Sequence, residues 1–159
     1  MSVGETKKIR DISIFKDLSE DEAAFLGEFI EVQNVNPKET ILRENQITRS
    51  LFLIAKGKVE ILINIPGKEP KHIVDLDKGN FFGEMSFLDG RLHSASVISL
   101  DHCEIMILRK KDFDHISKER PFLANKILSS MLKAVLIRLR DTNKKLKEIL
   151  AGENYAKEG

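Results

Sequence analysis

The chain has 159 residues, a formal net charge of +1 at pH 7, a hydrophobic share of 42% and a charged share of 32%. This balance is typical of a globular protein with one domain and an appended element. A net charge so near zero gives no electrostatic reason to expect nucleic-acid binding by the whole chain. Cys103 is the only cysteine, which excludes an internal disulfide and a multi-cysteine metal cluster.

The N-terminal part, residues 9–31, is expected to be helical. The segment MSVGETKKIRD before it has no apolar signal-peptide core, and no apolar run of the chain approaches the length of a membrane span. We therefore expect a cytoplasmic protein without a membrane partner. Ser19 and Glu22 form an S-x-x-E capping box that opens a helix. Apolar residues are expected to pack this part on the core, first in a short helix or turn and then on one helix face: Ile12, Ile14, Phe15, Leu18, Phe25, Leu26, Phe29 and Ile30.

Between residues 32 and 108 the hydrophobic period changes to two, and turn residues separate short apolar runs. Lys56-Gly57 and the Pro66-Gly67 pair are examples of these turn signals. Roughly eight short strands at this spacing predict a sandwich, jelly roll or small barrel. The fold class expected is mainly β with helices (α+β): an eight-stranded β-roll with a short N-terminal helix and a long C-terminal helix.

The stretch 81–97, FFGEMSFLDGRLHSASV, combines turn residues, one acid followed by small hydroxyls, and strand-like ends. A glycine precedes a short helical piece from Glu84 to Leu88, a turn follows at Asp89-Gly90, and a strand resumes at Ser94. The first turn of such a helix presents free backbone N–H groups, which suit an anion. We interpret this stretch as a ligand-holding loop.

Residues 110–150 are predicted to form a short helix, Lys110 to Ser117, and a long helix that starts beside Pro121. Its apolar positions alternate spacings of three and four around one polar member: Leu132, Val135, Leu139, Thr142, Leu146 and Ile149. This heptad stripe predicts a homodimerisation helix. Packing of the helix on its own roll is the alternative, because the first half has a second apolar face: Phe122, Ile127, Leu128, Met131 and Leu136. Residues 151–159 are expected to form a flexible tail.

The order of helix, β-roll with a glycine-rich cassette, and long helix resembles the cyclic-nucleotide-binding domain family. The motifs are Gly57-Lys58-Val59, Gly79, the run Phe82-Gly83-Glu84-Met85-Ser86-Phe87, and Ser94-Ala95-Ser96-Val97. The resemblance covers about Ile9 to Leu150 and is nearest to a bacterial stand-alone sensor domain of the catabolite activator type. It implies that domain 1–150 senses a cyclic nucleotide such as cAMP, is not an enzyme and needs no other cofactor or metal.

The resemblance also implies roles for residues of the cassette, residues 81–97. Glu84 would accept a hydrogen bond from the ribose 2′-hydroxyl, and the backbone N–H groups of Gly83 and Ser86 would bind the cyclic phosphate. Met85 lies between them in the same ligand-binding turn. Ser94 resembles a hydroxyl that some bacterial members direct at the phosphate, although a strand-surface serine is the alternative.

Two residues of the long helix, Thr142 and Asn143, resemble positions that meet the base in bacterial activator relatives. Thr142 also interrupts the apolar stripe, so it is open whether it contacts the base or sets the register of the dimer. In either case the long helix is expected to transmit binding to a protein partner.

The chain departs from the family at His93, which stands four residues before Val97, where the phosphate arginine is expected. Arg91 is out of register. A guanidinium is always charged, whereas imidazole offers one donor when neutral and two when protonated. Binding should weaken roughly ten- to a hundred-fold, and affinity should rise below about pH 6.5. If His93 is instead a solvent-facing loop residue, the chain is a degenerate dimeric scaffold that binds another anion or only a protein.

Other functional classes have weaker support. A metal-binding cupin needs an H-x-H pair, whereas His72, His93, His102 and His115 are scattered. A haem sensor would need His72, His93 or Cys103 as axial ligand, but Cys103 fits a small core residue better. The chain stops about where related regulators begin a helix-turn-helix, and the basic run of the long helix reads as a solvated face. No nucleic-acid partner is therefore expected.

Overall fold

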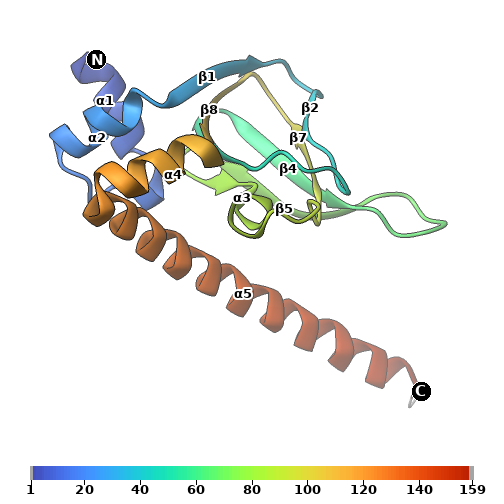
Figure 1. Cartoon of the computed structure of the whole chain (residues 1–159). Coiled ribbons are helices and arrows are strands. Elements are labelled where there is room, and N and C mark those ends of the chain that lie inside the picture. Colours follow the sequence, from blue (N-terminus) through green and yellow to red (C-terminus); the bar gives the residue numbers. More distant parts are fainter. Residues whose placement is uncertain (1, 158–159) are drawn as a thin grey trace.

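The computed structural model describes residues 2–157 and the side chains as far as Gly152. Its eight strands form two antiparallel four-stranded sheets, ordered β1-β8-β3-β6 and β2-β7-β4-β5, which confirms the expected β-roll (Figure 1). The strands are β1 (Ile30–Val35), β2 (Thr40–Leu42), β3 (Ser50–Lys56), β4 (Lys58–Ile63), β5 (Lys71–Asp77), β6 (Phe81–Phe82), β7 (Ser96–Ser99) and β8 (Cys103–Arg109).

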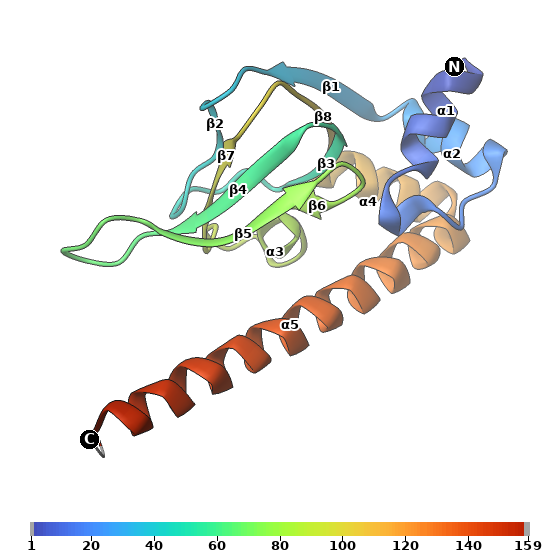
Figure 2. The same cartoon turned by 180° about the vertical axis from the view of Figure 1, so that it is seen from behind.

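The helices are α1 (Val3–Arg10), the 3-10 turn η1 (Ser13–Phe15), α2 (Glu20–Gly27), α3 (Glu84–Asp89), α4 (Lys110–Glu119) and α5 (Pro121–Lys157). Of the helices, α1, α2 and α4 lie at one end of the roll, whereas α3 lies beside the strands and the last helix, α5, runs outward past it (Figures 1 and 2). Within residues 2–157, none of these helices combines the length and the apolar character needed to cross a bilayer.

The N-terminal part contains one element that the sequence analysis missed. Helix α1 opens with a capping box in which Ser2 N–H donates to Glu5 at 2.7 Å. This is the same S-x-x-E signal that was recognised at Ser19 and Glu22, where the capping box is confirmed. The expected helix face was too long, because α2 ends at Gly27 and Ile30 already pairs with Leu108 in β1. Strand pairing overrides the helical period there.

Strands β8, β3 and β6 are buried on both faces, whereas the edge strand β1 is mostly exposed. Along β3, Leu51 and Leu53 face the cluster formed with the N-terminal helices and α5, whereas Phe52 and Ile54 face the interior of the roll. This double burial explains why β3 reads as the continuous apolar run LFLIA rather than as a strict alternation. The strand that carries the cassette, β6, pairs with β3 and is therefore held by the core on both sides.

Helix α5 changes its environment along its length. Its first turns are packed in the core through Leu123, Ala124, Ile127 and Met131. Of the second apolar face expected in the first half, only Ile127 and Met131 are buried, whereas Phe122, Leu128 and Leu136 are exposed. Beyond Arg138 every described side chain is exposed, including Leu139, which is 53% exposed. Helix α5 continues to Lys157, so residues 151–157 of the tail expected at 151–159 are helical and its flexibility stays a prediction. A single glycine, Gly152, among good helix formers does not end a helix.

Two glycines with positive φ test how closely the roll is packed. A Cβ at Gly57 (φ +92°) would lie 2.7 Å from Asp101 Oδ1, Cys103 Sγ and His102 O, whereas a Cβ at Gly67 (φ +73°) meets nothing within 4 Å. We expect Gly67→Ala to cost about 1–2 kcal/mol through backbone strain alone. Gly57→Ala should cost roughly 1–3 kcal/mol more because of overpacking. Urea denaturation of both variants measures this difference, and equal losses would contradict the close packing at Gly57.

Candidate functional site

The cassette is anchored by Gly83, which precedes α3 with φ 80°. A Cβ at this position would lie 2.8 Å from the Phe52 ring and 3.0 Å from the Ser50 carbonyl oxygen. Only glycine tolerates both the left-handed backbone and this approach. Gly90, with φ 70°, ends the helix after one and a half turns. The sheet therefore dictates where α3 begins and which way its first turn faces.

The first turn of α3 contains polar groups without partners. Glu84, Met85 and Ser86 contribute N–H groups that an α-helix leaves without an intrahelical acceptor. The Ser86 side chain is 0% exposed, and its Oγ has no hydrogen-bond partner in the described part of the chain. Buried polar groups are normally satisfied. These donors therefore fit a bound anion such as a cyclic phosphate.

Arg138 of α5 contacts the cassette, and the sequence analysis did not identify this residue. Its Nη1 donates to Glu84 Oε1 at 3.1 Å and its Nη2 donates to the Phe81 carbonyl oxygen at 2.6 Å. The guanidinium also lies over the Phe81 ring, 4.1 Å from the centroid. The side chains of Arg138 and Glu84 are only 30% and 15% exposed. This single residue joins the long helix to the ligand-holding turn.

Arg138 was not singled out in the sequence because it belongs to the basic run of the long helix, which was interpreted as a solvated face. Arg138 lies four residues before Thr142, and the Thr142 hydroxyl donates to its carbonyl oxygen at 2.9 Å. Residues four apart share a helix face. Because Arg138 lies one helical turn before Thr142, a predicted base contact, it was the cation of the helix to choose as a site candidate.

His93 is buried and does not face solvent. It is 4% exposed, its Nε2 lies 2.7 Å from Thr48 Oγ1, and its backbone N–H donates to Gln46 O at 2.8 Å. The alternative of a solvent-facing loop histidine is therefore wrong. Burial lowers the pKa of His93 below its ordinary value, and the negative charge of Glu84 opposes this shift to a smaller extent. The expected onset of protonation near pH 6.5 is accordingly too high.

The other candidate residues differ in their surroundings. Ser94 is exposed, and its Oγ lies 3.5 Å from Met85 Sδ, so these two border the same turn. Arg91 is exposed, and its backbone N–H donates to Asp89 Oδ1 at 2.9 Å. Thr142 and Asn143 are exposed on the part of α5 beyond Arg138. The predicted cassette residues thus lie in one segment of the chain: Glu84, Met85, Ser86, His93 and Ser94. Thr142 lies one helical turn after Arg138, the residue of α5 that contacts Glu84.

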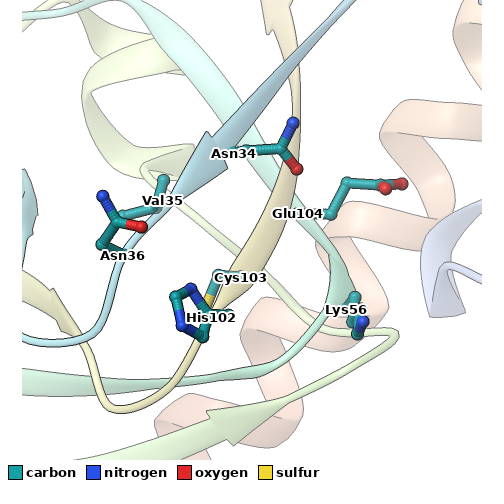
Figure 3. A pocket seen from close by; sticks show the side chains of 7 residues that line it. All are labelled: Asn34, Val35, Asn36, Lys56, His102, Cys103 and Glu104. Carbon is teal, nitrogen blue, oxygen red and sulfur yellow. The ribbon is translucent and has the colours of Figure 1, made fainter.

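A separate polar hollow of about 140 Å³ lies where β1, β3 and β8 meet the loop at His102 (Figure 3). Its thiol, Cys103, is buried and its Sγ lies 3.3 Å from Lys58 O. Burial raises the pKa of Cys103, and a hydrogen bond with Asp101 raises it further. The thiol therefore stays protonated and belongs to the core rather than to nucleophilic chemistry. In the described residues, His, Cys, Asp and Glu form no group of three that could hold a metal.

A family profile described as "Cyclic nucleotide-binding domain" matches residues 32–120, which include the cassette. The chain belongs to this family. Human cGMP-dependent protein kinase 2 is 32% identical over 92 residues, which are 57% of this chain and 12% of the kinase. The cyclic AMP receptor protein of Thermus thermophilus is 24% identical over 133 residues, covering 84% of this chain and 60% of that protein. The chain thus spans about an eighth of the kinase it matches.

Solved structures agree with the family assignment. A cyclic nucleotide-binding domain from Methylobacillus flagellatus superposes with a TM-score of 0.80 at 26% identity, covering 89% of this chain and 79% of that one. The Thermus thermophilus catabolite activator protein superposes with a TM-score of 0.76 at 23% identity, covering 86% and 62%. The second match supports the fold alone. The chain is therefore a cyclic nucleotide-binding regulatory domain by family and by fold.

The burial of His93 predicts a pH-dependent stability. Because its pKa is lowered in the folded state, the unfolded chain binds more protons as pH falls below about 6.5. The contribution of the neutral imidazole is fully present above that pH and is lost as pH falls through the folded pKa. Urea denaturation at pH 7.5 and pH 5.5 should show a smaller loss of stability for His93→Gln than for the wild type. The exposed His102→Gln serves as control, and wild-type-like behaviour of His93→Gln would contradict the assignment.

Proposed function

We propose that this domain is a non-enzymatic sensor whose cassette, residues 81–97, binds a cyclic nucleotide of the cAMP type and signals through α5. The observation that carries the proposal is the contact of Arg138 with Glu84 and Phe81, because it couples the ligand-holding turn directly to the long helix. The proposal concerns nucleotide sensing alone. The kinase relative is matched over only 12% of its length, so catalysis is not carried over.

The phosphate would lie at the first turn of α3. Its oxygens would accept from the N–H groups of Gly83 and Ser86, and the unpartnered Ser86 hydroxyl supports an acceptor on this side. Ser94, beside Met85 on the same turn, would add a hydroxyl. Such N–H groups stabilise an anion without carrying a formal charge.

The ribose would bind through Glu84. Arg138 uses only Oε1 of this carboxylate in its ion pair, which leaves Oε2 available to accept from a 2′-hydroxyl. The guanidinium also offsets the negative charge of Glu84, so that an anionic phosphate can approach the same turn with less repulsion. Arg138 is therefore a positioning residue for Glu84 and a source of positive charge that His93 does not supply.

His93 makes the proposed binding weaker than an arginine would. Its Nε2 is engaged by Thr48 and its pKa is lowered, so it remains neutral and hydrogen-bonded within the roll at pH 7. A neutral imidazole forms a weaker hydrogen bond to phosphate than a guanidinium does. The phosphate would then be bound by the backbone N–H groups of α3 and stabilised by the positive charge of Arg138.

The base would lie toward α5, where Thr142 and Asn143 follow Arg138. Proteins named for cGMP and for cyclic AMP are both similar to this chain. We infer an adenine preference from the catabolite activator type of overall likeness, with Thr142 and Asn143 meeting the base edge. In the unliganded helix the Thr142 hydroxyl donates to Arg138 O, and it would have to share this bond with the base.

The exposed half of α5 supports a homodimer in which a second copy covers the heptad stripe. Leu132, Leu139, Leu146 and Ile149 are 60%, 53%, 52% and 60% exposed, and such a row of leucine-type side chains fits a second identical helix. Since Arg138 stands at the start of this exposed half, a ligand that alters its contacts would alter the dimer surface offered to a partner protein.

Isothermal titration calorimetry with cAMP and cGMP at pH 7 tests the nucleotide proposal. We expect binding of cAMP, and Glu84→Gln should weaken it about ten- to a hundred-fold because a charged hydrogen bond to the ribose is lost. Arg138→Ala should weaken it to a similar degree. Arg140→Ala on the same helix and Glu69→Gln in the β4–β5 turn are matched controls that should leave the affinity unchanged. Absence of binding by the wild type would sink the sensor proposal and favour a scaffold.

Dimerisation is tested by placing a lysine inside or outside the stripe. Leu139→Lys should weaken the dimer roughly a hundredfold, because two charges would be buried at the interface. Ile137→Lys is the matched control, since Ile137 is 58% exposed but lies about 200° away around the helix. Sedimentation velocity at several concentrations measures both. Equal dissociation constants for the two variants would rule out this face as the interface.

A further inference from the structure

A basic hollow of about 420 Å³ lies between the start of β3 and the junction of β8 with α4. It is lined by Thr48, Arg49, Arg109, Lys110, Lys111 and Asp114, among others. Two segments far apart in the sequence supply its cations, and a backbone hydrogen bond from Lys110 N–H to Arg49 O, 3.0 Å long, ties them together. None of its lining residues belongs to the cassette, residues 81–97.

Positive charge in this hollow exceeds its partners. Arg109 forms an ion pair with Glu31 at 2.6 Å, and Lys110 pairs with Asp114. Arg49 and Lys111 form no ion pair with any described side chain. The lining thus contains four cations and one carboxylate, Asp114, while Glu31 and the first-turn acid Asp112 lie outside it.

The electrostatic repulsion among these cations favours binding of an anion in the hollow. Arg109, Lys110 and Lys111 stand where α4 begins, with no side-chain cap, and cations at a helix start oppose the macrodipole. Arg49 adds a guanidinium from a different segment, so the cluster does not follow from the helix alone. Repulsion among these cations would be relieved by an anion bound between them.

We propose that the basic hollow is a second anion site, which binds the phosphate group of a phosphate monoester. A guanidinium and several ammonium groups around one concavity match the three oxygens and the double charge of such a group. The monoester can be free in solution or part of a phosphorylated side chain of a partner. The chemistry recognised is the same in both cases, and the test separates them.

The position of the hollow connects it to the cassette. The Thr48 hydroxyl at its edge is bonded to His93 Nε2 at 2.7 Å. The Arg49 guanidinium lies 3.4 Å from the place where a Cβ of Gly90 would stand, at the end of α3. An anion that draws Arg49 and Thr48 toward itself would thus act on α3 and on His93. This coupling rests on the proposed nucleotide binding, whereas the anion site itself does not.

Amide chemical shifts of the ¹⁵N-labelled full chain, titrated with inorganic phosphate, test the site without nucleotide. The amides of Arg49, Lys111 and Asp112 should shift and saturate, beyond any change caused by sodium chloride of equal ionic strength. Arg49→Gln combined with Lys111→Gln should weaken this binding at least about tenfold, whereas Lys68→Gln in the β4–β5 turn should not.

Two results would overturn the proposal. The first is a phosphate response confined to the amides of Gly83 to Ser86, which would place the anion in the cassette. The second is a double variant that binds phosphate as the wild type does while its circular dichroism is unchanged. A phosphoserine peptide compared with its unphosphorylated form distinguishes the source: at least about tenfold tighter binding than inorganic phosphate indicates a phosphorylated partner, and equal binding indicates a free monoester.

If the site is coupled to the cassette, saturating phosphate changes the affinity for cAMP in the wild type but not in the double variant, and cAMP changes the phosphate affinity by the same factor. Failure of cAMP to bind would remove only this last comparison. The direct phosphate titration would still decide the anion site.

Discussion

The contact of Arg138 with Glu84 and Phe81 is the interaction on which the functional arrangement depends. It combines an ion pair, a hydrogen bond to a backbone carbonyl and a guanidinium lying on an aromatic ring, all in a partly buried place. An arginine held on three sides has little rotamer freedom left, so the position of α5 and the position of the cassette turn are linked. The outer half of the helix, beyond this contact, is exposed.

The contact works because the turn beneath it is rigid. Phe82 of β6 stacks on Phe52 of β3 with the ring planes 4° apart, and these two strands are buried on both faces. Gly83 follows directly and lies against the same Phe52 ring. Core packing thus sets the direction of α3, and the polar groups of its first turn are presented at a fixed place rather than by a mobile loop.

His93 stands at the position where the family resemblance predicts a phosphate arginine. The imidazole is withdrawn into the roll and bonded to Thr48, so positive charge reaches the turn from Arg138 on one side. Arg49 and the cations that begin α4 form the basic hollow. Thr48 lines the hollow and is bonded to His93, so this pair connects the hollow with the cassette.

Local patterns in the sequence were sufficient to determine the eight strands, the turns at Gly57 and Gly67, the capping box at Ser19 and the short helix of the cassette. Each of these depends on neighbours within a few residues: alternation, turn chemistry or capping. The end of α2, the burial of His93 and the role of Arg138 could not be determined in this way. They depend on pairing between Ile30 and Leu108, on the contact of His93 with Thr48, and on a helix that returns to the cassette 54 residues later in the chain. Only the tertiary structure decides such contacts, because a side chain's partner and its solvent exposure are properties of the packed chain and not of its local sequence.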